Sequence, residues 1–405
     1  MAYDPLRAAF EIREQLVSEK RRIAFFFGAG TSMAVGIPGI EELTARVSER
    51  IETPFDEPWD RIKSELSKDA DIEAILNRVR IYRELIGDSE DIEYNGINGA
   101  KAAKALDSAI CHAICDIIGD KPPKGLESHY KFAQWLRSLC FNRNYPVEIF
   151  TTNYDLLFEQ AMEKLGIPFF DGFIGSVNPF FVPESVDAEF GGINGISCPP
   201  ISWTRLWKIH GSINWYNQRD TELKQGRISR SSGLKPKHEE ELLIYPSRDK
   251  YMQSRKLPFI AFQDRFHKFI SSGERLVIVL GYSFSDEHLN EILFQGLRSN
   301  PHLAVTTFIY ESLSKELEDY CKVYRNLAIY GPDKASVGGL TAEWNTGSDK
   351  ISDDYNSFWD EEKKRFTLGD FNCFASFLEE FIGFKSAIYN QPLDTSITSH
   401  DTQVK

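Results

Sequence analysis

The sequence is short of the features that mark membrane proteins and disulfide-rich proteins. No stretch approaches the ~20 consecutive apolar residues that cross a bilayer as a helix. Only 6 cysteines occur in 405 residues, which do not make a disulfide framework. The first residues, MAYDPLRAAFEIREQL, have early acidic side chains and no apolar segment like that of a signal peptide. We therefore expect a cytoplasmic protein.

Close cysteine pairs are also scarce, and this bears on zinc. Cys111 and Cys115 lie one helical turn apart and could supply half of a zinc site. No second close pair exists among the other four, Cys140, Cys198, Cys321 and Cys373. Since structural zinc sites are built from closely spaced ligand pairs, we expect Cys111 and Cys115 to be buried in a helix core and the protein to hold no zinc.

Positive charge is outnumbered in this chain. Lys and Arg total 47 against 60 Asp and Glu, for a net charge of −13. This balance argues against a broad nucleic-acid footprint, because phosphate contacts need clustered Lys and Arg. A local basic strip at 219–237 is interpreted as a solvated loop. The 42% hydrophobic and 26% charged fractions are ordinary for a soluble globular protein.

Strand-like and helix-like segments alternate along the chain. Short apolar runs rich in β-branched and aromatic residues predict strands at 22–27, 147–152, 205–209, 241–246, 275–281 and 304–310. Amphipathic patterns predict helices at 41–51, 155–165, 286–297 and 314–324. The order is typical of an α/β fold, namely a Rossmann-like, doubly wound and mostly parallel sheet covered by helices on both faces.

The intervals between these elements suggest a further organisation. Residues 42–145 are almost wholly helical in pattern and predict a large helical insertion. Residues 168–204, full of Gly, Pro and aromatic residues, predict an ordered functional loop, and 218–241 a polar excursion. We expect one domain over residues 1–385, the insertion within it, and a flexible tail at 386–405.

Four marked stretches follow predicted strands, where open parallel sheets bind their ligands. The first is the turn Gly28-Ala29-Gly30-Thr31-Ser32. Its glycines let the backbone approach a phosphate, and its hydroxyls and amides could donate to a diphosphate at a helix N-terminus. A simple tight connection is the alternative, because the G-x-G-x-x-G spacing is not met and no clear ribose carboxylate follows about 20 residues later.

The second stretch is Thr151-Thr152-Asn153-Tyr154-Asp155. Asn153 offers a donor and an acceptor, and Asp155 can accept two hydrogen bonds. The alternative is helix capping ahead of the predicted helix, and one residue can do both.

The third and fourth stretches contain a histidine and a second glycine turn. His210 ends a strand and precedes Gly211, and its ordinary pKa suits a general base near neutrality. A histidine satisfied in the core is the alternative. Gly281 and Ser283 follow another strand, and a helix is predicted to begin near Asp286, where an acidic side chain suits the helix dipole and could be purely structural.

Together these stretches resemble the sirtuin family. The matching motifs, in the family's order, are GAG-x-S-x-x-x-GIP at 28–38, T-x-N-x-D at 151–155, K-x-HGS at 208–212 and G-x-S at 281–283. The resemblance implies a sirtuin-like NAD-binding catalytic domain over 1–385 that cleaves the nicotinamide–ribose bond of NAD+. Two departures are Gly39-Ile40-Glu41, where sirtuin deacylases usually carry Asp-Phe-Arg, and the missing paired C-x-x-C motifs.

The segment GYSFSDEHLNEIL and the helical insertion look more like the sirtuin-like NAD hydrolases of bacterial anti-phage defence. That resemblance implies an NAD-depleting effector with NAD+ as its substrate. It also implies a partner in trans, a HerA-like hexameric ATPase or an Argonaute. An NAD-dependent protein deacylase and a non-catalytic subunit that binds NAD or ADP-ribose stay open as alternatives.

The resemblance also implies roles for single residues. The turn from Gly28 to Ser32 would hold the diphosphate, with Ile37 and Pro38 shaping the nicotinamide pocket. Asn153 would position the ribose hydroxyls and the attacking water, Asp155 would bind the carboxamide, and His210 would act as the base. Further NAD+ contacts are implied at Thr152, Gly211, Gly281 and Ser283, with weaker adenosine candidates at Tyr310 and Glu311.

A homo-oligomer built through the helical insertion is a further expectation. Apolar positions available for it are Trp59, Ile62, Leu66, Ile72, Ile75, Leu76, Val79, Ile81, Tyr82 and Leu85. The same residues could instead form the core of the insertion itself. The sequence leaves both interpretations open.

Overall fold

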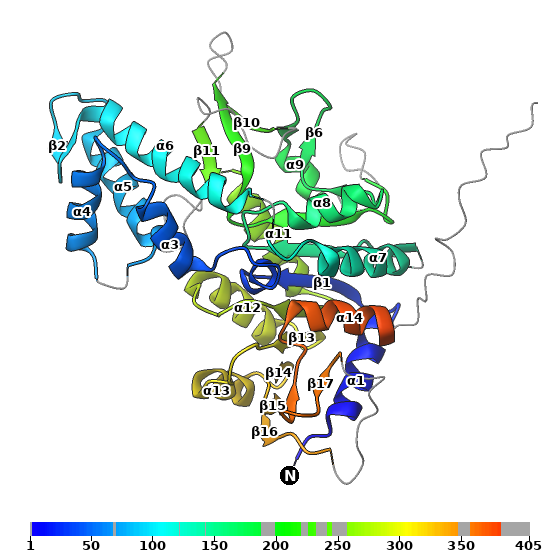
Figure 1. Ribbon diagram of the computed structural model, residues 1–405. Helices are drawn as coiled ribbons and strands as arrows, with labels where there is room; N and C mark the ends of the chain where they lie inside the picture. The colour runs from blue at the N-terminus through cyan, green and yellow to red at the C-terminus, as the bar shows by residue number, and fades with distance from the viewer. Residues whose placement is uncertain are drawn as a thin grey trace, which may run out of the picture.

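The main sheet has nine strands (Figure 1). Their order is β16-β15-β14-β13-β12-β1-β4-β8-β5. Its strands are β1 (Arg22–Phe27), β4 (Glu148–Thr151), β5 (Phe169–Phe170), β8 (Thr204–Lys208), β12 (Arg275–Leu280), β13 (Leu303–Phe308), β14 (Leu327–Tyr330), β15 (Lys334–Val337) and β16 (Leu340–Glu343). All neighbours from β5 to β14 pair in parallel, and β15 and β16 add an antiparallel edge.

This order confirms the predicted Rossmann-like, doubly wound fold. Chain order runs outward from β1 through β4 to β8 on one side and from β12 through β13 to β14 on the other. It therefore reverses between β1 and β12, and ligands of such sheets bind beyond the strand ends at that reversal. The structure, a computed structural model, describes residues 2–67, 70–120, 122–141, 143–187, 199–219, 226–231, 241–244, 257–346 and 357–381. The expected tail at 386–405 lies outside these ranges.

Helices cover both faces of the sheet, as the apolar strands predict. One layer consists of α1 (Pro5–Val17), α7 (Glu127–Phe141), α8 (Leu157–Lys164) and α14 (Phe371–Phe381). The other consists of α9 (Pro183–Val186), α11 (Phe259–Ser271), α12 (Glu287–Ser299) and α13 (Lys315–Val323). Along β1 the side chains alternate between the layers: Phe25 and Phe27 enter the first core, and Ala24 and Phe26 the second.

A second, antiparallel sheet corrects two predictions. Its order is β11-β9-β10-β7-β6, with bounds β6 (Phe173–Ile174), β7 (Phe180–Phe181), β9 (Gly211–Arg219), β10 (Gly226–Arg230) and β11 (Glu241–Ile244). The run at 241–246 was therefore wrongly placed in the parallel sheet, because it pairs with β9. The predicted polar excursion contains β10, which forms a hairpin with β9. Residues 220–225 and 232–240 lie outside the described ranges.

Helices α3 (Ile40–Ser48), α4 (Asp56–Glu65), α5 (Ile72–Ile86) and α6 (Gly99–Ile118) form a unit with its own hydrophobic core. A hairpin of β2 (Glu93–Tyr94) and β3 (Ile97–Asn98) precedes α6. We call residues 40–118 the helical module. In Figure 1 its helices α4 and α5 lie far from α1 and α14. The predicted insertion extends further, to residue 145, but α7 packs on the main sheet. We therefore propose 40–118 as the bounds of the insertion.

The core of the helical module takes up most of the apolar residues considered for oligomer contacts. Seven of them are buried in it: Trp59, Ile62, Ile72, Ile75, Leu76, Val79 and Tyr82. Leu85, in contrast, is 53% exposed. The core interpretation therefore explains these seven residues, and they supply no surface for a second copy.

The close cysteine pair lies in the interior of a helix. Cys111 and Cys115 are buried in α6, as predicted, and burial raises the pKa of the Cys111 thiol well above its ordinary value. Within the described ranges, no three His, Cys, Asp or Glu side chains are grouped so as to hold a metal ion. No helix in the described part of the chain is long and apolar enough to cross a bilayer.

Candidate active site

The glycine turn after β1 packs directly against the turn after β12. The Gly30 amide donates to the Gly281 carbonyl oxygen at 2.9 Å. A Cβ at Gly28 would lie 2.5 Å from the Gly281 oxygen, and one at Gly30 would lie 2.6 Å from the Gly281 Cα. These glycines therefore let two backbones meet at the reversal of strand order. Ala29 is exposed in this turn.

The hydroxyl groups of Thr31 and Ser32 are directed into the protein. They belong to α2 (Gly30–Met33), a single helical turn, and both residues are buried. Thr31 Oγ1 donates to the Gly28 carbonyl oxygen at 3.0 Å, and Ser32 Oγ donates to Asp155 Oδ2 at 2.5 Å. Either hydroxyl would have to leave these acceptors in order to donate to a diphosphate.

Asn153 and Asp155 complete a buried network that we call the polar cluster, comprising Thr31, Ser32, Asn153 and Asp155. Asn153 Nδ2 donates to Thr31 Oγ1 at 2.9 Å and to Ser32 Oγ at 2.8 Å. Asp155 Oδ1 also accepts from the Leu157 amide at 3.1 Å, two residues on, although the N-cap of α8 is Leu156. The capping interpretation of Asp155 is therefore wrong in its strict form, since its carboxylate binds the first helical amide from one position before the N-cap, and its role in a site stays a prediction.

The backbone of the β4–α8 loop is held by a buried lysine. Lys208 ends β8, is 2% exposed, and donates to the Asp155 carbonyl oxygen. Its Nζ also lies 2.9 Å from Glu159 Oε1. Burial raises the pKa of Glu159, and the nearby Lys208 charge opposes that rise. Sequence reasoning gave Lys208 no role, although it stands two residues before His210 in the quoted motif.

His210 lies in the turn from β8 to β9, where Gly211 has a φ of +97°. The turn is buried, and the His210 side chain is 11% exposed. Its Nε2 lies 3.3 Å from Asp286 Oδ2. Asp286 is the N-cap of α12, as the acidic start of that helix predicts, and its Oδ1 accepts from the Leu289 amide. Nothing in the local sequence pattern indicates that Asp286 meets His210.

The other residues predicted to contact NAD+ differ in burial: some lie inside the protein and others on its surface. The Thr152 amide donates to the Phe27 carbonyl oxygen and so ties the end of β4 to β1. Ile37 is buried in the core of the helical module, and Pro38 is half-buried. Ser283 is exposed and lies 2.8 Å from Ser285 through their hydroxyl oxygens. Tyr310, also exposed, follows the end of β13.

The helical module touches the loop that carries Asn153. Tyr154 OH donates to Glu73 Oε1 on α5 at 3.2 Å. Burial raises the pKa of Tyr154, and the Glu73 carboxylate adds to the rise. Leu156 and Leu157 enter the same hydrophobic core as Ile75 and Leu76 of α5. The module is therefore packed onto the candidate active site and not merely tethered to the sheet.

A second histidine, His129, lies on α7 among aromatic rings. Its ring centroid is 4.9 Å from that of Phe158 and 4.8 Å from that of Phe371. Among the described residues, neither ring nitrogen has a hydrogen-bond partner. Burial lowers the pKa of His129 to about 4, although the Asp155 carboxylate partly opposes this shift. His129 is thus a neutral core side chain at neutral pH.

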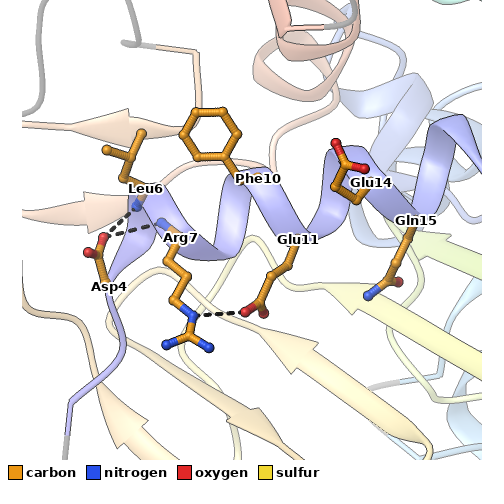
Figure 2. A pocket seen from close by; sticks show the side chains of 7 residues that line it. All are labelled: Asp4, Leu6, Arg7, Phe10, Glu11, Glu14 and Gln15. Carbon is orange, nitrogen blue, oxygen red and sulfur yellow. Dashed lines mark hydrogen bonds and ion pairs between the residues drawn. The ribbon is translucent and has the colours of Figure 1, made fainter.

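A hollow beside α1 is a separate feature. It has a volume of about 670 Å³ and is open to solvent. Figure 2 shows its lining residues, Asp4, Leu6, Arg7, Phe10, Glu11, Glu14 and Gln15. Arg7 pairs with Glu11 at 2.9 Å, with both side chains more than half exposed. An exposed pair of this kind contributes little, so we assign this hollow no binding role.

With this geometry in place, the chain can be compared with known proteins. Residues 147–329 match the family model of the SIR2-like domain. Three of the four motif stretches lie in this SIR2-like region, and the glycine turn at 28–32 precedes it. No curated protein matches the chain. A solved structure of a Sir2 homolog–NAD complex is similar at 11% identity and a TM-score of 0.35, covering 79% of this chain and 87% of the other.

Proposed function

We propose that the protein hydrolyses NAD+ at the bond between nicotinamide and ribose, releasing nicotinamide and ADP-ribose. The observation that carries this proposal is the set of polar side chains at the carboxyl ends of adjacent strands β4 and β8: Asn153, Asp155 and His210. All three lie in the SIR2-like region. An amide, a carboxylate and an imidazole beside the reversal of strand order are groups suited to bind a nucleotide and move a proton.

The chemistry asks little of a general acid. Nicotinamide leaves as a neutral molecule from a positively charged pyridinium, so the leaving group needs no proton. The protein must orient the ribose, stabilise the oxocarbenium-like charge at C1′ and deliver water. In the proposal, the glycine turn approaches the diphosphate through its backbone at Ala29, and Ser283 meets the adenosine side.

The polar cluster supports a specific role for Asn153. Because its Nδ2 is bound to two hydroxyl oxygens, the amide is held in one orientation. Its Oδ1 is then the atom proposed to accept a hydrogen bond from a ribose hydroxyl or from the attacking water. Asp155, similarly fixed by Ser32 and the Leu157 amide, would face the carboxamide.

His210 is proposed as the base that takes a proton from water or from a ribose hydroxyl. A positioned general base typically contributes ~10²–10⁴ in rate. The proposal includes a biological role as an NAD-depleting effector in anti-phage defence, which rests on the resemblance of the 281–293 segment and of the helical module. It also includes activation by a HerA-like ATPase or another partner in trans.

Product analysis tests the proposed reaction. Purified protein is incubated with NAD+, alone and together with the product of a neighbouring gene, and products are separated by chromatography. We expect equal amounts of nicotinamide and ADP-ribose. Binding of NAD+ with no product under either condition would favour the non-catalytic alternative.

A second assay separates hydrolysis from deacylation. We expect no loss of acetyl groups from lysine peptides in the presence of NAD+, together with no stoichiometric zinc by elemental analysis. We expect no zinc because the sequence does not contain two closely spaced pairs of cysteines. About one zinc per chain with acetyl release would support the deacylase instead.

A further inference from the structure

The contact between His210 and Asp286 joins two distant parts of the sheet. His210 follows β8, and Asp286 follows β12; β1 and β4 lie between these strands. Nevertheless His210 Nε2 and Asp286 Oδ2 are 3.3 Å apart, with side chains 11% and 5% exposed. This separation is long for a hydrogen bond and within the range of an ion pair, and such contacts often tighten when substrate binds.

The two carboxylate oxygens of Asp286 do different things. Oδ1 accepts from the Leu289 amide at 2.9 Å and caps α12. Helix capping needs only this one oxygen. Oδ2 faces the imidazole of His210. Helix capping therefore explains the position of Oδ1, and the contact with His210 is a second interaction, made by Oδ2.

Several hydrogen bonds hold the loop that carries Asp286. Tyr282 OH lies 2.8 Å from Asn290 Oδ1 and 3.2 Å from the Asp286 carbonyl oxygen. Asn290 Nδ2 in turn donates to the Phe284 carbonyl oxygen at 2.6 Å. Phe284 has a φ of +58°, a conformation that non-glycine residues seldom adopt. These contacts fix the position of Asp286 relative to α12.

We propose that Asp286 is the positioning residue for His210, an inference that rests on the proposed function. Asp286 accepts the Nε2–H of the neutral imidazole and so selects the tautomer with its lone pair on Nδ1. Nδ1 is then the atom that accepts the proton. The resulting imidazolium is stabilised by the Asp286 carboxylate, which does not itself become protonated.

Hydrolysis moves one proton from water to His210 and exchanges the bond at C1′. One O–H bond of the attacking water breaks, and its proton forms a bond to Nδ1 of His210. The water oxygen supplies an electron pair to the new bond at C1′. The C1′–N bond breaks, and its electron pair remains on nicotinamide, which leaves uncharged.

The kinetic test is Asp286→Asn. Asparagine retains the cap, because its side-chain oxygen can accept from the Leu289 amide. We expect kcat to fall between about tenfold and 10⁴-fold with KM within about twofold, as for an interaction made in the transition state. The matched control is Asp4→Asn at the N-cap of α1, where Asp4 accepts from the Leu6 and Arg7 amides. The control should keep the parental kcat.

An activity-independent measurement separates this proposal from the proposed function. Histidine ring ¹⁵N shifts report the tautomer, and His210→Gln assigns the His210 signals by their loss. We expect the Nε2–H form in the parent and a mixed or changed tautomer in Asp286→Asn. An unchanged tautomer in that variant would overturn the proposal even if the protein has no activity on NAD+. A parental kcat in Asp286→Asn, in an active protein, would overturn it as well.

Discussion

Two buried side chains at the end of β8, Lys208 and His210, each contact a carboxylate, and the two contacts differ in what they hold. Lys208 reaches Glu159 on α8 and the carbonyl oxygen of Asp155, so its ammonium fixes the backbone of the loop that carries Asn153. His210, two residues later, meets Asp286 at the start of α12. The first contact thus holds backbone, and the second is the one that we propose to position an imidazole. Two residues of one short motif therefore differ in role: Lys208 holds the loop structure, and His210 is the one proposed to take part in the chemistry.

Removing the side chain that Lys208 helps to position should have the largest effect. We expect Asn153→Ala to lower kcat for NAD+ cleavage by about 10²-fold or more, because the amide that orients ribose and water is lost. The substitution also leaves the Thr31 and Ser32 hydroxyls without this donor. Circular dichroism and a denaturant titration should show a folded protein. A folded variant with the parental kcat would refute the role of Asn153.

The structural pair can be broken from one side or from both. We expect Lys208→Met to lower the free energy of unfolding by about 3–5 kcal/mol, because Glu159 is left buried without its cation. Lys208→Met combined with Glu159→Gln should recover part of that loss. Both free energies come from urea titrations. Equal losses in the single and double variants would mean that the ion pair does not cause the effect.

The third prediction concerns how stability depends on pH through the buried side chain of His129. The pKa of His129 is lowered to about 4 in the folded protein, so the folded state binds fewer protons than the unfolded state below the ordinary pKa of about 6.5. Stability should therefore fall as pH decreases from about 6.5 to 4, by about 3 kcal/mol at most. In His129→Phe this part of the pH dependence should disappear. An identical pH profile in parent and variant would exclude His129 as its source.

The smallest effect is expected at the outer position Ser283. Its exposed hydroxyl can contribute to binding without taking part in bond cleavage. Ser283→Ala should raise KM by a few-fold and leave kcat near the parental value. Steady-state kinetics with NAD+ provide the measurement. A loss confined to kcat would count against an adenosine-side role.

The fold was largely predictable because its strands are apolar on both faces. Runs such as RIAFFF at 22–27 show that pattern, and their alternation with helical segments predicts a doubly wound sheet. The run at 241–246 was misplaced, since an apolar stretch does not reveal which strand it pairs with. Likewise, the sequence pattern of the apolar residues in α5 does not distinguish a hydrophobic core from an interface between copies.

The candidate site could be predicted from the sequence as a set of residues after strands, but its contacts could not. Glycine turns and polar side chains after strands indicate the carboxyl edge of the sheet, and the structure places these residues there. The hydroxyl oxygens of Thr31 and Ser32 accept from Asn153, and the Ser32 hydroxyl donates to Asp155; both partners lie more than 100 residues away in the sequence. The contact between His210 and Asp286 depends on the packing of α12 against the β8–β9 turn, and helix capping alone already explains Asp286 locally.

We propose above all that this chain cleaves NAD+ with His210 as its base. The most direct test is a time course of nicotinamide release by the parent and by His210→Gln, at equal concentration and with the same activating partner. We expect steady release by the parent and a rate lower by about 10²–10⁴-fold in the variant, which should remain folded. Equal rates of release by the two proteins would contradict the claim.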